Sequence, residues 1–397
     1  MTVTPLVVVG NPDNRRVALF LAAAVRAARP VTVLPWRQLA AGPVELPTGG
    51  LVRVDSPGED PEVDRLLRGA TVPAAHGEIT GLAAWYAGLC AALDRLAQAA
   101  ARAGATLLND PRDIAVMFDK RACHARLTRL GVSVPPALPT VAGDWAGLRA
   151  ALRSAGWSRV FVKPAHASSA SGVLALQLAP GRIRATTSVE LTDDGRLFNS
   201  LRVRDYRTES EVAAIVDRLA PDGLHVERWF PKAGIGQRTV DLRVLVVAGE
   251  PSHVVVRASR GPLTNLHLGN VRGDLAAVRE ALGPVGYAGA LTTCVRAAAA
   301  FPGCLHAGVD LLIGSDWRRH AVAEVNAFGD LLPRLHDDAG RDSYDAQLHA
   351  LAAGRFVVPP VTVPPMAVPP MADPPVTVPP LSPPPAPPAA ARPAVPA

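Results

Sequence analysis

The residues with the clearest chemistry lie in a segment that is predicted to form a hairpin, Asp310-Leu-Leu-Ile-Gly-Ser-Asp-Trp-Arg-Arg-His-Ala-Val-Ala-Glu324-Val-Asn326. Asp310 and Glu324 stand at equal distances from Trp317 in the polar turn, so we expect them to face each other on neighbouring strands. Asn326 shares their face because side chains alternate along a strand. Two carboxylates and an amide oxygen suit Mg²⁺, which takes few protein ligands together with phosphate oxygens. The pattern predicts a metal site, and two solvent-exposed acids are the alternative interpretation.

An earlier apolar hairpin carries a second set of charges. Asp241 and Arg243 share one face of its first strand, and Asp241 and Arg257 stand at equal distances from Gly249 in the turn. We therefore expect Asp241 and Arg257 to be neighbours. An ordinary ion pair between strands is one interpretation, and a guanidinium group that reaches a metal-bound triphosphate is the other.

Lysine is rare in this chain, since Lys120, Lys163 and Lys232 are the three lysines among 41 basic residues. A chain so rich in arginine is expected to keep lysine where a compact, flexible ammonium group is needed. Lys120 and Lys163 stand on separate segments, and an acidic stretch follows at Glu227. This order is typical of a nucleoside triphosphate site, while solvated surface lysines are the alternative.

Hydrophobic patterning predicts the elements that position these residues. Strands at 6–9 and 31–34, joined by a helix at 15–28, have the rhythm of a parallel α/β unit. A helix from Pro111 to Gly131 carries Asp119-Lys120. Further along the chain we expect a helix at 145–155, strands at 160–163, 173–178 and 224–229, and the two hairpins. The turn at 10–14 closes the first strand, and Arg15 or Arg16 beside it is a candidate anion contact.

Composition argues against several classes of function. The net charge of +6 is small for 397 residues, and aromatic residues make up 5% and are scattered, so no nucleic-acid partner is expected. Four cysteines without a CxxC pair or metal-ligand spacing fit a reduced, cytoplasmic protein. Charges interrupt the most apolar stretch, residues 79–103, and early charges argue against a signal peptide, so we expect no membrane association.

The composition changes abruptly at Val358. The tripeptide VPP recurs at 358–360, 363–365, 368–370 and 378–380. Proline at this density removes backbone donors and fixes φ, so we expect a disordered, polyproline-II-like tail. A low-complexity tail without a function is one interpretation, and a docking segment for a PxxP-binding partner is the other.

The order of the motifs resembles that of the ATP-grasp enzymes, and is most similar to glutathione synthetases and to the glutamate ligases that extend a ribosomal protein tail. The resemblance covers residues 109 to 335 and rests on many weak motifs in the same order. The matching segments are Asn109, Asp119-Lys120, Gly131 with Pro135-Pro136, Val162-Lys163, the loop 168–172, Glu227-Arg-Trp-Phe, Asp241-Leu-Arg243, Thr264-Asn-Leu-His-Leu-Gly269, and Asp310 with Glu324-Val-Asn326.

The resemblance implies a site for ATP and Mg²⁺, with Mn²⁺ as an alternative ion. Both lysines would contact phosphates, the backbone of residues 227–229 would bind adenine, and Arg243 would meet the γ-phosphate. The implied nucleotide-binding residues are Lys120, Lys163, Ser169, Gly172, Glu227, Trp229, Asp241, Arg243 and Asn265. The implied metal ligands are Asp310, Glu324 and Asn326, and the implied catalytic residues are Lys163, Arg243 and Arg257.

Three departures from the family pattern affect what can be carried over. The phosphate loop at 166–172 has one glycine where relatives often have several. An arginine that often precedes Asn265 is missing, and Arg257 or Arg260 would have to replace it. Ala327-Phe-Gly-Asp330 stands where the family commonly has Ser-Pro-Gly, beside the acceptor site, so the acceptor is not implied by the resemblance.

The implied fold is α/β, with a Rossmann-like parallel domain at 1–110, a central lid at 111–228, an α+β domain with an antiparallel sheet at 229–356, and the tail at 357–397. The implied activity is ATP-dependent ligation of a small-molecule or peptide carboxylate to an amine, or to a thiol, through an acyl phosphate. Two alternatives remain open. One is phosphorylation of a hydroxyl group, and the other is a non-catalytic nucleotide-binding scaffold with a docking tail.

Overall fold

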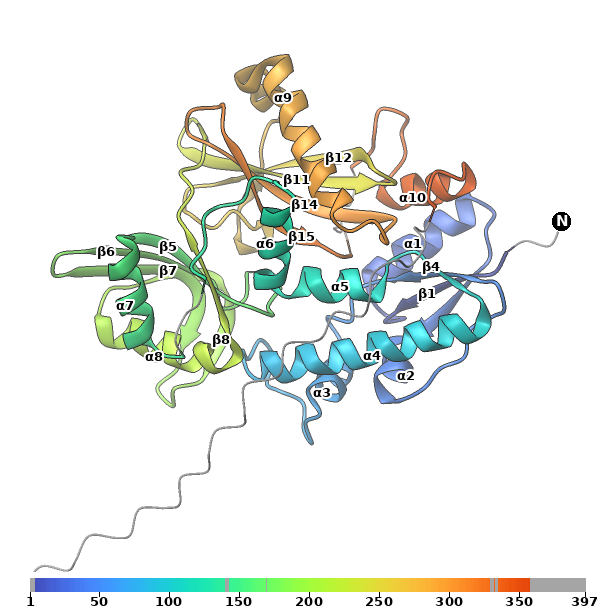
Figure 1. The fold of residues 1–397 in the computed structure, drawn as a ribbon, viewed down its shortest axis with the longest axis horizontal. Helices are drawn as coiled ribbons and strands as arrows, with labels where there is room; N and C mark the ends of the chain where they lie inside the picture. The colour runs from blue at the N-terminus through green and yellow to red at the C-terminus, as the bar shows by residue number, and fades with distance from the viewer. Residues whose placement is uncertain (1–3, 140–142, 169, 329–331, 333–334, 358–397) are drawn as a thin grey trace, which may run out of the picture. The chain divides into compact units, whose positions relative to one another are not determined.

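The computed structural model of the chain describes residues 4–139, 143–168, 170–328, 332 and 335–357. They form three β-sheets with helices packed on them (Figure 1). The predicted proline-rich tail and Ser169 lie outside the described residues. Among the described helices, none is long and apolar enough to cross a membrane.

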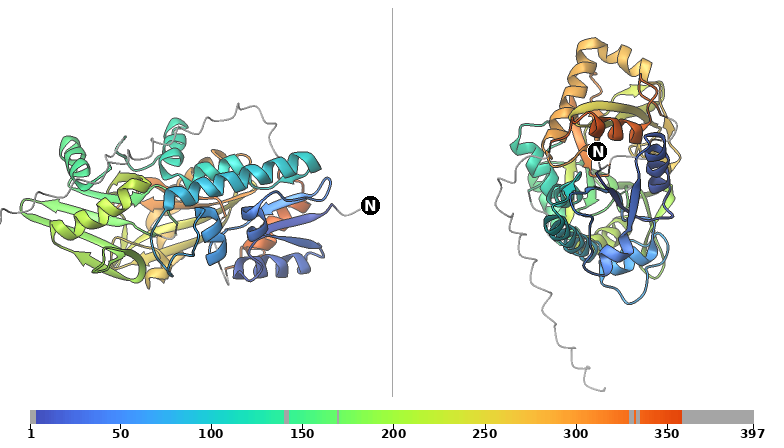
Figure 2. Two further views of the ribbon diagram at one scale, coloured as in Figure 1. Left: turned by 90° about the horizontal axis from the view of Figure 1, so that it is seen from below. Right: turned by 90° about the vertical axis from the view of Figure 1, so that its right-hand side faces the viewer.

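The first sheet is parallel and has the strand order β2-β1-β3-β4. Its strands are β1 (Leu6–Gly10), β2 (Val31–Pro35), β3 (Leu51–Val54) and β4 (Thr106–Leu107), and its helices are α1 (Arg15–Arg26), α2 (Trp36–Ala41), α3 (Pro61–Arg68) and α4 (Leu82–Ala103). Every residue of β1 is buried, as expected for a central strand of a parallel sheet that is covered on both faces. The long helix α4 packs against α2 and α3 (Figure 1 and Figure 2).

The prediction of a single helix from Pro111 to Gly131 is wrong, because the chain forms two helices there, α5 (Pro111–Phe118) and α6 (Lys120–Arg129). Asp119 separates them with an extended backbone at φ −97° and ψ 105°. Its side chain accepts hydrogen bonds from the amides of Arg121 and Ala122, which caps the start of α6. Lys120 therefore stands at the first position of a new helix.

The second sheet is antiparallel, with the order β8-β7-β6-β5-β9. It consists of β5 (Arg159–Pro164), β6 (Leu174–Ala179), β7 (Arg182–Leu191), β8 (Leu197–Tyr206) and β9 (Leu224–Arg228), with α7 (Trp145–Ala155), α8 (Glu209–Leu219) and η1 (Ala220–Asp222). Apolar residues of these strands and of α7 and α8 share one buried cluster. The strands β7 and β8 were not predicted, whereas α7 has the predicted bounds.

The third sheet has the order β13-β12-β11-β14-β15, with β10 paired to β11. Its elements are β10 (Gly234–Ile235), β11 (Arg238–Val247), β12 (Glu250–Ser259), η2 (Leu266–Leu268), β13 (Val271–Arg272), α9 (Leu275–Ala299), β14 (His306–Ile313), β15 (His320–Asn326) and α10 (Ser343–Ala352). The helix α9 packs on one face of this sheet (Figure 2). Leu242, Val309 and Leu311 are fully buried in the same core cluster as Cys294 and Ala297 of α9, so charged side chains are confined to the other face.

The predicted fold class is confirmed, because a parallel N-terminal sheet is followed by two antiparallel sheets. The domain boundaries stay a prediction.

Candidate functional site

One face of the third sheet carries the charged residues that the two hairpins were predicted to bring together. Asp241 pairs with Arg257 across β11 and β12, and Asp310 pairs with Glu324 across β14 and β15, so both predicted registers are confirmed. Arg243 pairs with Asp310 across β11 and β14, which joins the two hairpins. A bulge follows Asp310 and shifts the remaining pairs of the last hairpin by one residue. The charged side chains of all four strands therefore meet on one face.

Asp310 lies at the centre of this face and is held by two guanidinium groups. Its Oδ2 accepts from Arg243 Nη2 at 3.2 Å and from Arg257 Nη1 at 3.1 Å, and its Oδ1 accepts from Arg243 Nε. Burial by itself would raise the pKa of Asp310, but Arg243 and Arg257 outweigh it and lower the pKa below its ordinary value. Asp310 is therefore an ionised carboxylate beside two cations.

Asp241 is 1% exposed and has partners on both of its oxygens. Arg257 Nε donates to Oδ1 at 2.7 Å, and Lys232 Nζ at 3.2 Å and the Thr264 hydroxyl donate to Oδ2. Burial opposes ionisation here too, yet Arg257 and Lys232 lower the pKa of Asp241 to about 2. Both oxygens of the Asp241 carboxylate thus have partners inside the protein, and the carboxylate holds Arg257 toward Asp310.

The second sheet contributes Lys163 and Glu227 from the neighbouring strands β5 and β9. Lys163 Nζ donates to Glu227 Oε2 at 2.6 Å, and His225 Nε2 lies 2.9 Å from the other oxygen, Oε1. An ionised carboxylate can only accept, so His225 carries its proton on Nε2. Burial would raise the pKa of Glu227, but Lys163 and His225 hold that pKa at about 2.

The segment that is predicted to bind adenine continues β9. Arg228 N donates to Pro136 O at 2.7 Å and Trp229 N donates to Arg159 O at 3.0 Å, so these two amides are already paired. The Trp229 ring contacts Phe161, with ring centres 4.9 Å apart and an interplanar angle of 38°, and the Arg159 guanidinium carbon lies 4.5 Å from the centre of the Trp229 ring. The role of this backbone toward adenine stays a prediction.

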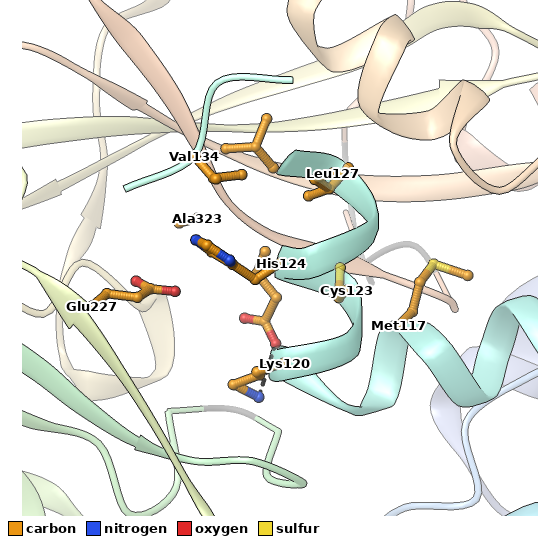
Figure 3. A pocket seen from close by; sticks show the side chains of 10 residues that line it. Met117, Lys120, Cys123, His124, Leu127, Val134, Glu227 and Ala323 are labelled. Atoms are coloured by element: carbon orange, nitrogen blue, oxygen red, sulfur yellow. Dashed lines mark ion pairs between the residues drawn. The ribbon is translucent and has the colours of Figure 1, made fainter. Parts of the chain in front are cut away.

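Lys120 connects the two antiparallel sheets. Its Nζ donates to the Ala167 carbonyl, in the segment that follows β5, and lies 3.2 Å from Glu324 Oε1 on β15. The pocket beside it is shown in Figure 3, where Glu227 faces the side chains of α6. The residues that line this pocket are Met117, Lys120, Cys123, His124, Leu127, Val134, Glu227, Val322, Ala323 and Glu324.

The three predicted metal ligands fit a hard divalent cation by the chemistry of their donors. Asp310 and Glu324 are directly paired across two strands. Asn326 Nδ2 donates to Gly308 O at 3.3 Å, so the amide nitrogen of Asn326 is the atom that this contact uses, and its amide oxygen is directed away from Gly308 O. Oxygen donors in small number suit Mg²⁺. Within the described ranges no group of three His, Cys, Asp or Glu side chains could hold a metal, so the two carboxylates would need further oxygen donors, such as the Asn326 amide or phosphate oxygens.

Two predicted nucleotide-binding residues lie on backbone turns. Gly172 has φ 72°, and a Cβ atom built there would lie 2.5 Å from Pro164 Cγ, so glycine is required by the turn itself. Asn265 precedes η2, and its carbonyl accepts from Leu268 N at 3.1 Å and from Asn270 Nδ2 at 3.0 Å. The roles of both residues toward a nucleotide stay predictions.

Sequence reasoning missed His225, which contacts Glu227, and it assigned no role to Thr264, although Thr264 begins one of the segments that match the family. His225 could have been found, since it stands two residues before Glu227 and strand alternation places both on one face. The contact between Thr264 and Asp241 could not have been predicted, because it joins a loop to a strand without any periodic signal.

Comparison of the sequence with known protein families and with curated proteins finds no match. Comparison of the fold with solved structures does find similar proteins. The ATP-grasp ligase PsnB in complex with a minimal precursor is 18% identical and has a TM-score of 0.50, with 89% of this chain and 99% of that chain covered. The D-cycloserine synthetase DcsG is 16% identical with a TM-score of 0.52, covering 88% and 99% of the two chains. The macrocyclase MdnC from Microcystis aeruginosa MRC, bound with the precursor peptide MdnA, is 12% identical with a TM-score of 0.52, covering 88% and 100%. These similarities, together with the two antiparallel sheets that meet at Lys120, show that the chain has the ATP-grasp fold.

Proposed function

We propose that this protein is an ATP- and Mg²⁺-dependent ligase that joins a carboxylate to an amine through an acyl phosphate. The observation that carries the proposal is the position of Lys120. Its ammonium group contacts Ala167 O beside one antiparallel sheet and Glu324 on the other, so it lies between the candidate phosphate loop and the candidate metal ligands. A triphosphate bound there would meet cations from both sheets.

The positive side chains would bind and orient the triphosphate. Lys120 and Lys163 would neutralise phosphate oxygens, and Arg243 would bind the γ-phosphate with the planar pair of donors that suits phosphate. Arg257, held by Asp241, would stay beside Asp310 and keep that carboxylate ionised. Asp310, Glu324 and Asn326 would hold Mg²⁺, which neutralises the charge of the transferred phosphoryl group when bound.

The reaction balances without a covalent nucleophile from the protein. An oxygen of the substrate carboxylate attacks the γ-phosphorus, the bond to ADP breaks, and an acyl phosphate forms. The amine nitrogen then attacks the acyl carbon, inorganic phosphate leaves, and the nitrogen loses a proton. The protein contributes positioning and electrostatic stabilisation, and removing one such contact typically costs on the order of 10²–10³ in rate.

The structural neighbours bear on the substrate only by analogy. PsnB and MdnC are described with precursors, and DcsG as a D-cycloserine synthetase, so peptides and small amino-acid derivatives are the substrates to try first.

The test is ADP release from Mg-ATP in the presence of hydroxylamine, with a panel of amino acids and short acidic peptides as carboxylates. Hydroxylamine replaces the unknown amine and converts an acyl phosphate into a hydroxamate, which is detected by its iron(III) colour. Hydroxamate formation that matches ADP release supports the proposal. ADP release with a stable phosphorylated product would contradict it in favour of a kinase, and Mg-ATP binding without ADP release would favour a scaffold.

A further inference from the structure

A stacked pair of rings joins the start of the candidate phosphate loop to the helix α4. The rings of Tyr86 and His166 have centres 4.0 Å apart and an interplanar angle of 13°. Tyr86 belongs to α4, while His166 follows β5 by two residues and is 7% exposed. Tyr86 is itself held in place, because its hydroxyl donates to Ala115 O of α5 at 3.0 Å. The stack therefore fixes His166 against two helices.

The orientation of the His166 ring follows from its polar neighbours. Nε2 lies 3.3 Å from Arg121 Nη2 and 3.9 Å from Asp119 Oδ2. A guanidinium group only donates, so His166 Nε2 accepts from Arg121, and the neutral ring carries its proton on Nδ1. Burial lowers the pKa of His166 to about 4, with Asp119 opposing the shift, so the ring is neutral near pH 7. Among the described residues, Nδ1 has no hydrogen-bond partner, which makes the stack and Arg121 the contacts that hold this ring.

The two neighbours of His166 along the chain both accept hydrogen bonds from Lys120. Lys120 N donates to Ala165 O at 3.0 Å, and Lys120 Nζ donates to Ala167 O. His166 thus stands between the two carbonyl groups that fix the backbone and the side chain of Lys120. Because the His166 backbone is continuous with both acceptors, a shift of this segment would change both contacts of Lys120.

We propose that His166 and Tyr86 are positioning residues that hold Lys120 in place through the carbonyls of Ala165 and Ala167. The two rings would thereby help to shape the proposed nucleotide site, and only the measurement of nucleotide binding rests on the proposed function. Neither ring needs to touch the nucleotide. The competing interpretation is that the stack only contributes core packing, in which case its loss would change stability and leave Lys120 where it is.

The first experiment needs no nucleotide and measures amide hydrogen exchange of the full chain over residues 119–123. Because the Lys120 amide is bonded to Ala165 O, we expect His166→Ala to speed its exchange about tenfold or more, while His166→Phe, which keeps a stacked ring, stays within about threefold of the wild type. The control is His253→Ala, which removes a histidine of β12 in the third sheet that is 2% exposed and bonded to Arg341 O. Unchanged exchange in His166→Ala, or equal acceleration in His253→Ala, would overturn the proposal.

The second experiment is a double-mutant cycle on the dissociation constant of Mg-ADP. His166→Ala should weaken binding several-fold in the wild type and hardly at all in a Lys120→Ala background, because its effect passes through Lys120. Additive effects of the two substitutions would contradict the positioning role. If the wild type binds no nucleotide while the exchange result holds, the proposed function fails and the link between His166 and Lys120 stands.

Discussion

Lys163 Nζ lies 2.6 Å from Glu227 Oε2, and the same arrangement of a cation on a site carboxylate recurs at Arg243 with Asp310. In both pairs the basic residue is a candidate phosphate contact and the acid is part of the same site. A bound triphosphate would attract Lys163 and Arg243, and a bound divalent ion would attract the Asp310 carboxylate. We therefore expect nucleotide and metal to favour each other's binding.

Replacing Lys163 should damage stability as well as binding. Lys163→Met leaves Glu227, whose side chain is 5% exposed, without its cation, and breaking a buried pair in this way typically costs about 3–5 kcal/mol. The double variant Lys163→Met/Glu227→Gln removes both charges and should recover most of that stability without recovering nucleotide binding. Urea unfolding and the thermal shift with Mg-ATP measure the two effects. At about 100 times its Kd the ligand should stabilise the wild type by roughly 2.7 kcal/mol. If the double variant still showed this shift, Lys163 would not be part of the nucleotide site.

The metal assignment predicts a loss of divalent-cation binding at two positions. Glu324→Gln and Asp310→Asn keep the shape of the side chain and remove its charge, so Mn²⁺ binding in the presence of ADP, followed by electron paramagnetic resonance, should weaken at least tenfold in each, and turnover should stop. The Glu324 side chain is 28% exposed, so its variant should unfold like the wild type, whereas Asp310→Asn leaves two guanidinium groups less well compensated. Asp316→Asn, in the turn of the same hairpin, is the control and should bind Mn²⁺ normally. Normal Mn²⁺ affinity in Glu324→Gln would refute this metal site.

Gly172 should tolerate no side chain. With φ 72° and Pro164 Cγ 2.5 Å from the position of a Cβ atom, Gly172→Ala combines a left-handed backbone, which costs about 1–2 kcal/mol, with an overlap. Gly181→Ala is the matched control, since Gly181 has φ 66° and nothing within 4 Å of its Cβ position. Urea unfolding should show a larger loss for Gly172→Ala than for Gly181→Ala. Equal losses would mean that Pro164 moves away from the added methyl group without a loss of stability.

Acid should destabilise the protein through His306. Burial, which disfavours the imidazolium ion, together with nearby Arg53 lowers the pKa of His306 to about 3 from an ordinary value of 6.5. Between these two values the unfolded chain binds a proton that the folded chain does not, so stability falls as the pH falls through this window, by at most about 1.4 kcal/mol per pH unit. The variant His306→Leu lacks this term, so the difference in unfolding free energy between variant and wild type should grow in the variant's favour from pH 7 to pH 4. A difference independent of pH would show that His306 does not titrate in this way.

The two hairpin registers could be predicted because they are local. Equal distances from a turn and alternation along a strand fix which side chains oppose each other, and these two rules were enough to pair Asp310 with Glu324 and Asp241 with Arg257. The break between α5 and α6 was missed because the Asp119 cap lies inside an otherwise continuous helical pattern. The capping signal is a single side chain, and periodicity does not detect it.

By itself, the sequence determined the fold class, the candidate ligands and their order along the chain. The tertiary structure alone decided which charges meet, for example Lys120 with Glu324, and Arg257 with both Asp241 and Asp310. It also placed Tyr86 on His166, far from it in sequence. Such pairs depend on how whole sheets and helices pack, and packing joins segments that share no periodic pattern, so no spacing within either segment predicts the contact.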